Sequence, residues 1–364
     1  MNVLYDHQTF SLQTYGGISR YHTELITGIS KTAEHQAQVS LLLTNNVHLP
    51  ESGLNVRSLL PAYNIRGRGK SMYYLNQAYS ALKLWKAPYD VFHATYYDPY
   101  FLAFLKKPFV ITFHDMIYEK LSDQYKELAD DKSIIDNKKR LAEQATYIIT
   151  VSEHTKRDVI DLLGVKPDKI RVIYHGSSLP IAEGDSDGNT RPYLLYVGNR
   201  TMYKNFYGFL NAIYPLLKRY SIRLMCAGGG AFTKVEQESI ALLGVTEFVE
   251  QQPINDQILP LLYRRAVAFV FPSFYEGFGI PILEAFACSC PCIVSNTSSL
   301  PEVAGEAALY IDPASSDSMC YAVEQLLNDS ELRKKLVQKG LERLALFSWQ
   351  RTVEETLNLY KEVV

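Results

Sequence analysis

The residues best suited to chemistry lie in one stretch of the C-terminal half, AVAFVFPSFYEGFGIPILEAFA, which runs from Ala266 to Ala287. A short apolar run, typical of a buried strand, precedes the carboxylate of Glu276 in a glycine-containing loop, and Pro281 then opens an apolar helix. The first N–H groups of a helix have no partners within it, and glycine lets a ligand approach the backbone closely. We therefore expect this loop to bind a ligand rich in oxygen atoms.

A second carboxylate, Glu284, follows eight residues after Glu276. The pattern places Glu284 in the first turn of the helix, where the macrodipole favours an anion whatever the function. On the residues alone, a structural role and a ligand-binding role are both open for Glu284. Two carboxylates are also what a glycoside hydrolase uses, but an anion stabilised at a helix start is a poor proton donor, which argues against a hydrolase.

Basic side chains follow the first strand expected in the same half. Strand 193–197 is followed by Arg200 and Lys204, with Asn205 as the expected N-cap of the next helix. A lysine ahead of a helix N-terminus opposes the macrodipole unless an anion lies between them. This arrangement favours a diphosphate site, with two solvated surface cations as the alternative.

In the N-terminal half, the pair Gly16-Gly17 precedes an amphipathic helix, and His114 follows the apolar strand 109–113. We expect a histidine at this strand end to contact a substrate hydroxyl or to transfer a proton, and a hydrogen-bonded core histidine is the alternative. Weaker candidates of the same kind are His7, His93 and His175.

Short apolar strands alternate with helical patterns along the whole chain. Strands are expected at 3–5, 39–43, 90–94, 109–113, 147–151, 171–174, 193–197, 223–227, 246–250, 267–271, 292–295 and 308–311, and helices at 18–30, 71–85, 134–145, 318–328, 331–343 and 350–362. This alternation predicts an α/β protein with doubly wound, mostly parallel sheets covered on both faces. The alternation stops over a polar linker at 177–190, so we predict two domains, at 1–180 and 191–349.

Composition narrows the function classes. A length of 364 residues suits two domains, and a net charge of −2 argues against a nucleic-acid partner. No apolar run approaches membrane-spanning length and MNVLYDHQ lacks the features of a signal peptide, so we expect a cytoplasmic protein. No metal site is expected: the CSCPC segment lacks the spacing of a zinc site, and Asp185-Ser-Asp187 lies within the polar linker.

Three segments carry a resemblance to a known family: PSFYEGFGIPILEA, YVGNRTMYKNF and SSLPEVAGEAALYIDP. They are similar to the retaining glycosyltransferases of the GT-B fold, called glycosyltransferase group 1 or family 4, and the resemblance is strongest over 193–313. It implies two Rossmann-like domains facing each other across a cleft, the N-terminal one on the acceptor side, with a C-terminal helix, 350–364, crossing back to the first domain. It also implies a metal-independent hexosyltransferase (EC 2.4.1.-) without a cofactor.

The resemblance further implies a role for each matched residue. Arg200 and Lys204 would bind the donor diphosphate, Glu284 the ribose hydroxyls, and Glu276 the sugar. His114 would contact the transferred sugar near the acceptor. The implied catalytic set is thus Glu276, His114, Arg200 and Lys204, and the further donor-binding residues are Gly16, Gly17, Gly277, Phe278, Gly279, Ile280 and Glu284.

The segments TYGGISRYHTEL and YKNF are similar to a bacterial subgroup rich in mannosyltransferases of surface-polysaccharide and lipopolysaccharide assembly. This implies GDP-mannose as donor and a glycan or lipid-linked saccharide as acceptor. A UDP-sugar donor and a non-catalytic nucleotide-sugar- or carbohydrate-binding homologue are the alternatives. Aromatic residues at 96–104 either stack on acceptor sugars or pack as core. The tract Arg66-Gly-Arg68-Gly-Lys70 either contacts anionic lipids at the inner face of the cytoplasmic membrane or is solvated.

Overall fold

The chain is described by a computed structural model over residues 1–51, 57–58, 68–125, 128, 132–179, 191–200 and 202–364. It divides into two compact units, the first formed by Met1–His175 together with Trp349–Val364 and the second by Gly176–Ser348. Most of the expected linker lies outside the described residues, as do Asp185, Asp187 and Arg66.

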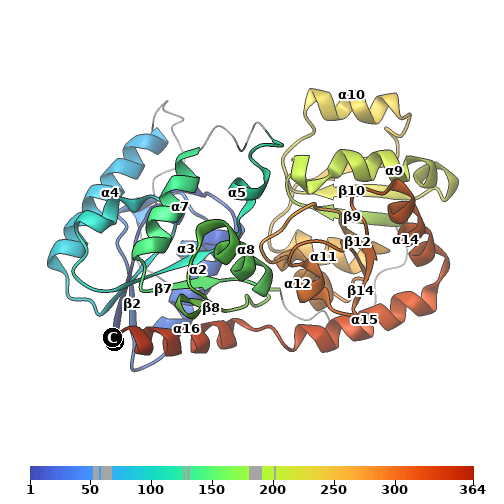
Figure 1. The fold of residues 1–364 in the computed structure, drawn as a ribbon. Coiled ribbons are helices and arrows are strands. Elements are labelled where there is room, and N and C mark those ends of the chain that lie inside the picture. Colours follow the sequence, from blue (N-terminus) through green and yellow to red (C-terminus); the bar gives the residue numbers. More distant parts are fainter. Residues whose placement is uncertain (52–56, 59–67, 126–127, 129–131, 180–190, 201) are drawn as a thin grey trace. The chain divides into compact units, whose positions relative to one another are not determined.

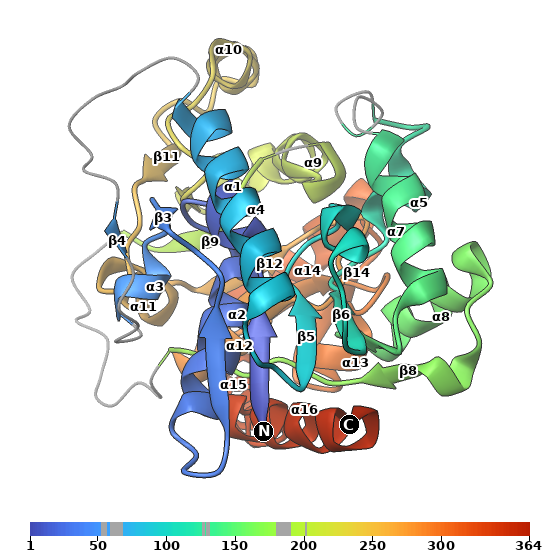
Figure 2. The same cartoon turned by 90° about the vertical axis from the view of Figure 1, so that its left-hand side faces the viewer.

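Unit 1 is built on a six-stranded parallel sheet of order β2-β1-β5-β6-β7-β8 (Figures 1 and 2). Its strands are β1 (Asn2–Tyr5), β2 (Gln36–Val39), β5 (Val91–Ala94), β6 (Phe109–Phe113), β7 (Tyr147–Thr150) and β8 (Ile170–Val172). A separate parallel pair is formed by β3 (Leu43–Thr44) and β4 (Arg57–Ser58). The helices are α1 (Gln8–Leu12), α2 (Gly17–Ser30), α3 (His48–Glu51), α4 (Arg68–Lys86), α5 (Ile117–Leu121), α7 (Lys132–Gln144), α8 (Glu153–Leu163) and α16 (Trp349–Val363), with 3₁₀ turns η1 (Pro99–Ala103) and η2 (Pro167–Lys169).

Unit 2 repeats this plan with a six-stranded parallel sheet of order β11-β10-β9-β12-β13-β14. Its strands are β9 (Tyr193–Val197), β10 (Arg223–Ala227), β11 (Val249–Gln252), β12 (Ala268–Phe271), β13 (Cys292–Ser295) and β14 (Ala308–Ile311). The flanking elements are η3 (Met202–Lys204), α9 (Phe206–Arg219), α10 (Lys234–Leu242), α11 (Ile258–Arg265), α12 (Ile280–Ala287), α13 (Leu300–Ala304), α14 (Ser316–Asn328) and α15 (Ser330–Leu344). The prediction of two doubly wound parallel sheets is confirmed.

The C-terminal helix α16 belongs to unit 1, where it packs against α2. Its Tyr360 is fully buried, and the Tyr360 hydroxyl lies 2.8 Å from the hydroxyl of Tyr5 on β1. Thr352 donates a hydrogen bond of 2.6 Å to the carbonyl oxygen of Tyr174. Val353 and Leu357 complete the same apolar core, so the end of the chain closes one face of the first sheet.

Each sheet has a point at which its connections leave in opposite directions. The first strand of unit 1, β1, lies between β2 and β5, and the first strand of unit 2, β9, lies between β10 and β12. In open α/β sheets ligands bind outside the carboxyl ends of the strands at such a switch point. The loops that follow β1 and β5 in unit 1, and β9 and β12 in unit 2, are therefore the places to look for function.

Two strands begin three residues away from their predicted starts, whereas the other strands begin within one residue of theirs. The strand expected at 39–43 is instead β2, which ends at Val39, because this edge strand is half exposed and does not show as an apolar run. The strand expected at 246–250 begins only at Val249, since the N–H of Phe248 closes a turn on the carbonyl of Val245.

Within the described ranges, every helix is too short or too polar to cross a membrane.

Candidate functional site

The loop that follows β12 holds Glu276 by its backbone. The N–H of Glu276 donates to Oγ of Ser298 at 3.0 Å, and the hydroxyl of Ser299 donates to the carbonyl oxygens of Glu276 and Phe278, both at 2.9 Å. Ser299 is fully buried. Buried hydrogen bonds of this kind fix the loop, so the direction of the Glu276 side chain is set by the fold.

The same loop ends at Gly279, the N-cap of α12, with φ of 112°. A Cβ atom there would lie 3.1 Å from Cδ2 of Leu300. Any other residue would also have to adopt the left-handed backbone conformation that glycine adopts here. Pro281 follows in the first turn, where its missing N–H costs nothing. The expected strand, loop and helix are thus confirmed.

The position of Glu284 differs from the predicted one. Because α12 begins at Ile280, Glu284 is its fifth residue and not part of its first turn, so the macrodipole does not account for it. Its Oε2 accepts a hydrogen bond of 3.1 Å from the hydroxyl of Tyr263, which is fully buried. Burial, together with the Glu284 charge, raises the pKa of Tyr263 well above its ordinary value. The phenol therefore remains a proton donor that orients this carboxylate.

Lys204 and Glu276 meet at the switch point of unit 2. Lys204 follows β9 through η3, Glu276 follows the neighbouring strand β12, and Nζ lies 2.6 Å from Oε1. The two side chains are 21% and 11% exposed, so a ligand at the surface can reach both. The ammonium group also lies 5.2 Å from the ring centre of Tyr203 and 5.4 Å from that of Phe271.

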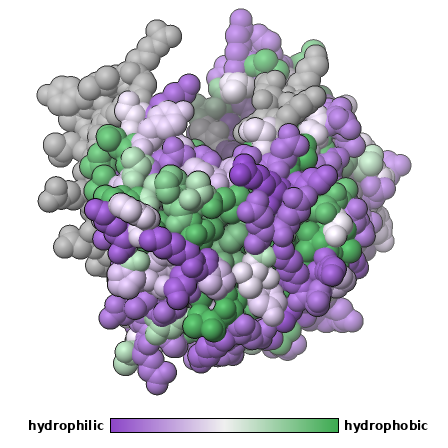
Figure 3. Space-filling view, turned by 60° about the vertical axis from the view of Figure 1, so that its left-hand side comes forward, coloured by the Kyte–Doolittle hydropathy of each residue, from purple (hydrophilic) through white to green (hydrophobic). Residues whose placement is uncertain are grey.

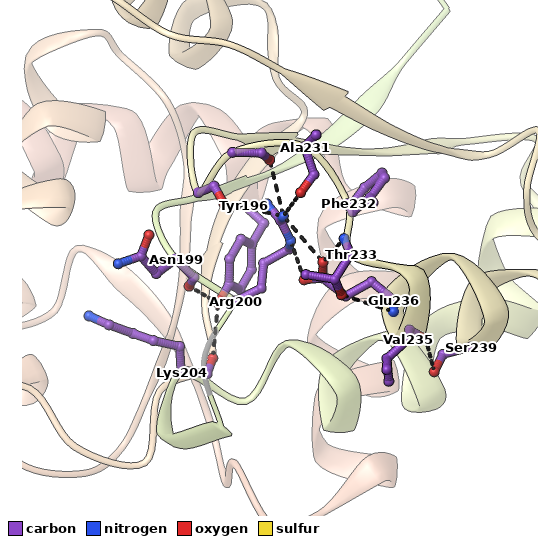
Figure 4. Close-up of polar contacts among 12 residues, drawn as sticks. Tyr196, Asn199, Arg200, Lys204, Ala231, Phe232, Thr233, Val235, Glu236 and Ser239 are labelled. Carbon is purple, nitrogen blue, oxygen red and sulfur yellow. Dashed lines mark hydrogen bonds and ion pairs between the residues drawn. The ribbon is translucent and has the colours of Figure 1, made fainter. Parts of the chain in front are cut away.

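Arg200 is engaged within the protein, as Figure 4 shows. Its Nε donates to Oε1 of Glu236 at 2.6 Å, and the guanidinium lies 4.8 Å from the ring centre of Phe232. The other guanidinium nitrogens donate at 3.1 to 3.4 Å to four successive carbonyl oxygens, those of Gly228, Gly229, Gly230 and Ala231. The side chain is only 3% exposed, and the Lys204 side chain extends away from the guanidinium (Figure 4).

The joint contact of Arg200 and Lys204 with a diphosphate stays a prediction, and the structure adds a role within the protein for Arg200. Its N–H groups are satisfied by Glu236 and the carbonyl groups of the glycine loop, so it holds that loop in place. Gly229, with φ of 68°, fits there because a Cβ atom would lie 2.6 Å from the carbonyl oxygen of Gly198.

Glu236 also closes a capping box at the start of α10, where its Oε2 accepts from the N–H of Thr233 at 2.6 Å. Burial acts to raise the pKa of Glu236, but the hydrogen bonds from Arg200 and Thr233 outweigh it and hold the pKa below its ordinary value. The pair with Arg200 is thus ionised at neutral pH.

The Tyr196 side chain fixes the segment between β9 and α9. The Tyr196 hydroxyl donates to the carbonyl oxygens of Asn199, at 3.0 Å, and of Lys204, at 3.3 Å (Figure 4). Asn205 occupies the N-cap position of α9 as predicted, but in the left-handed conformation, and its amide donates to the carbonyl oxygen of Pro313 at 2.7 Å instead of capping the helix.

In unit 1, His114 follows β6 and lies in a cluster of buried rings. Its ring is stacked on that of His175, with centres 6.0 Å apart, and meets Tyr21 edge to face at 5.1 Å. Burial, with the neighbouring His175, His93 and Lys138, lowers the pKa of His114 well below its ordinary value. Among the described residues its buried Nε2 has no hydrogen-bond partner.

Two of the other histidines named from the sequence are buried in the same cluster. Burial lowers the pKa of His93 and of His175 to about 3. Nε2 of His93 lies 2.9 Å from the hydroxyl of Thr112, and its Nδ1 contacts the hydroxyl of Tyr360. His93 is therefore a hydrogen-bonded core histidine, the alternative considered for His114.

A cavity of about 460 Å³ lies at the switch point of unit 1. Gln8 from the loop after β1 and Asp98 from the loop after β5 both line it. The N–H of Asp98 donates to Oε1 of Gln8 at 2.8 Å. Asp98 also accepts a hydrogen bond of 2.7 Å from the hydroxyl of Tyr73. The lining combines phenol rings with amide and hydroxyl groups: Gln8, Leu12, Gln13, Tyr73, Tyr96, Tyr97, Asp98, Tyr118, Ser133, Ile134 and Asn137.

The remaining predicted residues lie at helix starts. Gly16 is the N-cap of α2 and Gly17 its first residue, and one N–H of that turn, on Ser19, is already capped by the Gln13 side chain at 3.1 Å. Phe278 is buried against Phe347, with ring centres 5.9 Å apart, so only its backbone can meet a ligand.

Gly277 precedes this buried ring, and Ile280 is the first residue of α12. The cysteines of CSCPC are free and buried. Over the described residues, no three histidine, cysteine, aspartate or glutamate side chains are grouped to hold a metal ion.

Sequence reasoning did not single out four residues that shape this site: Glu236, Tyr263, Ser298 and Ser299. The spacing Thr233-x2-Glu236 is a capping-box signal, but nothing local links it to Arg200, which lies 36 residues earlier. The two serines lie in a segment that was recognised only as part of a family pattern.

Family comparisons agree with this architecture. Residues 184–343 match the model of the glycosyl transferases group 1, and residues 15–179 match that of glycosyltransferase family 4. The O-antigen chain mannosyltransferase B of Escherichia coli is 33% identical over 236 residues, which cover 60% of this chain and 61% of that protein. The chain thus spans about three fifths of the length of this relative.

Solved structures share the fold of the whole chain. A sucrose-phosphate synthase from Thermosynechococcus elongatus superposes with a TM-score of 0.79 at 19% identity, covering 100% of this chain and 98% of that one. Anabaena HepE in complex with UDP and glucose gives a TM-score of 0.78 at 14% identity, covering 99% of both chains. Together with the two family matches, these likenesses show that the chain belongs to the group 1 glycosyltransferases, family 4, and has their GT-B fold.

Proposed function

We propose that this glycosyltransferase transfers mannose from GDP-mannose to a saccharide acceptor in cell-surface polysaccharide assembly, with retention of configuration and without a metal ion. The observation that carries the proposal is the Lys204–Glu276 pair, joined at 2.6 Å at the switch point of unit 2. A cation and a carboxylate placed together beside a helix N-terminus suit a ligand that has both a diphosphate and sugar hydroxyls. The name of the Escherichia coli relative supports mannose as the sugar.

On this proposal, Lys204 and the backbone amides of the Glu276 loop bind the diphosphate and the sugar. Glu284, oriented by Tyr263, accepts hydrogen bonds from the ribose hydroxyls. Arg200 acts through the glycine loop that it holds, which makes it a positioning residue.

The reaction breaks the bond between the anomeric carbon of the sugar and the diphosphate oxygen, and forms a bond from that carbon to an acceptor oxygen. Negative charge builds up on the leaving diphosphate, where the Lys204 ammonium and the N–H groups at the start of α12 stabilise it. The acceptor attacks on the face from which the diphosphate leaves, and its proton passes to the departing phosphate oxygen. Neither the charge nor the proton then requires a metal ion.

The cavity of unit 1 is the proposed acceptor site. Its lining includes the phenol rings of Tyr96 and Tyr118 and the amide group of Asn137, a combination that suits a sugar ring with its hydroxyls. The Gln8 amide is already bonded to Asp6 and Asp98 and shapes the wall of the cavity. Among the described residues that line the cavity none is lysine or arginine, which favours an uncharged sugar over a phosphorylated one.

The decisive test is a thermal-shift panel of GDP, UDP, ADP and CMP with their common sugar conjugates, run with and without EDTA. A nucleotide at 100 times its Kd adds about 2.7 kcal/mol to the free energy of unfolding. Stabilisation by GDP and GDP-mannose, unaffected by EDTA, is the expected result. A strict requirement for manganese would overturn the metal-free mechanism.

A UDP-sugar donor is the second candidate, favoured by the likeness to HepE in complex with UDP and glucose. A thermal shift with UDP and its conjugates alone would replace GDP-mannose and leave the roles of Lys204 and Glu276 as proposed. The absence of a shift with every nucleotide would point to a carbohydrate-binding homologue without transferase activity.

A further inference from the structure

Helix α4 has one buried face and one exposed apolar face. The inner face carries Met72, Asn76 and Leu84, all buried. Asn76 fixes the helix to the chain after β2, since its Oδ1 accepts from the N–H groups of Leu42 and Leu43 at 3.0 and 3.1 Å. The packing of unit 1 therefore accounts for this side of α4.

The outer face of α4 is apolar and exposed. Tyr74, Leu75, Leu82 and Trp85 are 63%, 54%, 46% and 57% exposed. Leu75, Leu82 and Trp85 follow Tyr74 by 1, 8 and 11 residues, a spacing that places all four on one side of a helix. Ala78 lies between them on the same side. Apolar side chains gather in a patch bordered by hydrophilic ones on the side of the molecule where α4 lies (Figure 3). A contiguous exposed patch of this kind marks an interaction site.

The charged residues of α4 itself are of one sign. Every charged residue of α4 is basic: Arg68, Lys70, Lys83 and Lys86. Lys106 adds a further cation, because its Nζ donates to the carbonyl oxygen of Trp85 at 2.7 Å and lies 5.7 Å from the Trp85 ring centre.

The acidic residues that come next along the chain are already hydrogen-bonded. Asp90 accepts from the N–H of Asn2 at 2.7 Å, and Asp98 accepts from Tyr73. Both carboxylates keep their negative charge, but the five cations named above outnumber them.

We propose that the outer face of α4 binds an anionic lipid surface, with the helix lying in the plane of the interface. Leucine side chains would enter the boundary of the acyl chains, Tyr74 and Trp85 would lie at the headgroups, and the lysines would meet lipid phosphates. A second copy of the chain is a poorer occupant, since a symmetric contact would bring the same cations together.

Surface binding does not depend on the proposed reaction, because it needs no nucleotide. Tyr73, which adjoins Tyr74 on α4, lines the cavity of unit 1. An acceptor anchored in the bilayer by a lipid would therefore lie near that cavity, and this last step alone rests on the proposed function.

The test is co-sedimentation of the full chain with vesicles of phosphatidylglycerol and phosphatidylethanolamine, and with vesicles of phosphatidylcholine alone. Binding is expected to the anionic vesicles only, and to weaken as salt shortens the Debye length from about 10 Å at 0.1 M to about 3 Å at 1 M. Leu75→Glu with Leu82→Glu should lower the vesicle affinity at least about tenfold, equivalent to about 1.4 kcal/mol. The matched control is Leu242→Glu in unit 2, where Leu242 is 89% exposed and the substitution should change nothing.

Tryptophan fluorescence gives a second readout that does not depend on recovery in a pellet. The chain has two tryptophans, so Trp349→Phe leaves Trp85 as the single reporter. Its emission should shift to the blue with anionic vesicles and stay unchanged with phosphatidylcholine.

Two results would overturn the proposal: equal binding by the Leu75/Leu82 variant and the wild type, or no blue shift of Trp85 with anionic vesicles. A lipid-free dimer in sedimentation velocity, abolished by the same substitutions, would assign the face to self-association instead.

Discussion

Lys204 and Glu276 neutralise each other in unit 2, with Nζ 2.6 Å from Oε1. The two residues lie 72 positions apart and come from neighbouring strands on either side of the switch point. A diphosphate that approaches Lys204 must therefore compete with the Glu276 carboxylate. This competition separates the roles of the two residues in a way that can be measured.

Replacing Glu276 with glutamine should strengthen nucleoside diphosphate binding while sugar transfer is lost. Glutamine keeps the shape of the side chain but leaves the Lys204 charge to the ligand. A partly exposed ion pair contributes up to about 1 kcal/mol, so affinity for GDP should rise up to about fivefold. Isothermal titration calorimetry with GDP, beside a transfer assay, measures both effects.

Lys204→Ala is the matched variant and should weaken GDP binding as well as transfer. If Glu276→Gln and Lys204→Ala weakened GDP binding equally, the proposed division between the two residues would be wrong.

Arg200→Ala should destabilise unit 2 strongly, because it leaves Glu236 buried without its cation. Removing one partner of a buried ion pair costs about 3 to 5 kcal/mol of unfolding free energy. The surface pair Arg219–Glu324, in which Arg219 is 69% exposed, offers a control in the same unit. Arg219→Ala should cost no more than about 1 kcal/mol in urea unfolding.

Arg200→Lys distinguishes loop positioning from phosphate binding. A lysine retains the charge but cannot reach several carbonyl oxygens at once, so stability should fall while GDP affinity, measured below the unfolding transition, changes little. A large loss of GDP affinity at unchanged stability would restore the direct phosphate contact.

Tyr96→Ala should weaken acceptor use without affecting the donor. Loss of one ring face from the cavity of unit 1 should raise the acceptor KM about tenfold, which corresponds to about 1.4 kcal/mol. Tyr96→Phe keeps the ring and should behave nearly as the wild type. The exposed Tyr321 in unit 2, at 65%, provides the control Tyr321→Ala. An unchanged acceptor KM in Tyr96→Ala, measured with a water-soluble saccharide, would place the acceptor elsewhere.

The buried histidines of unit 1 should make the protein sensitive to acid. Burial lowers the pKa of His93 and His175 to about 3 and those of His22 and His114 well below the ordinary value. The unfolded chain therefore binds protons below about pH 6.5 that the folded chain does not. Stability should be fully present above pH 6.5 and fall by up to about 1.4 kcal/mol per histidine for each pH unit below it.

Urea unfolding at several pH values between 7.5 and 5 follows this loss. His114→Gln removes one titrating group, so the loss of stability per pH unit should be smaller by the contribution of one histidine. An identical slope in the variant and the wild type would show that His114 takes up its proton alike in the folded and the unfolded protein.

The fold was open to prediction because its signals are local. The strands at 109–113, 193–197, 223–227, 292–295 and 308–311 were predicted with the bounds that the structure gives. The first four are buried at nearly every position, and their short apolar runs reflect burial on both faces of a parallel sheet, a property that each strand shows by itself. Strand 308–311 is an edge strand with Tyr310 exposed, and its apolar sequence alone marked it. The edge strand β2 has no such burial, and its prediction was correspondingly misplaced.

The site was open to prediction only in part. Glu276 and Lys204 were identified because strand ends and glycines mark them, and the structure brings them together. The burial of Arg200 could not be foreseen, since it depends on Glu236 and on the carbonyl groups after β10, which are distant in the sequence. The cavity of unit 1 was anticipated only through the aromatic residues at 96–104, of which Tyr96 and Tyr97 line it. Gln8, Tyr73 and Asn137 could not be foreseen there, because they come from distant parts of the sequence.

The helix α16 has a consequence for the order in which the protein is completed during translation. Tyr360, Val353 and Leu357 belong to the core of unit 1, yet they follow unit 2 in the sequence, so the ribosome adds them after it. In the sequence, unit 2 lies wholly between the two parts of unit 1. Its synthesis can therefore be finished while the first sheet still lacks a covering helix. The usual sequence, in which the N-terminal domain folds first, is thus reversed for its last step. A chain stopped before Trp349 would leave that sheet face open to water, because it would lack α16.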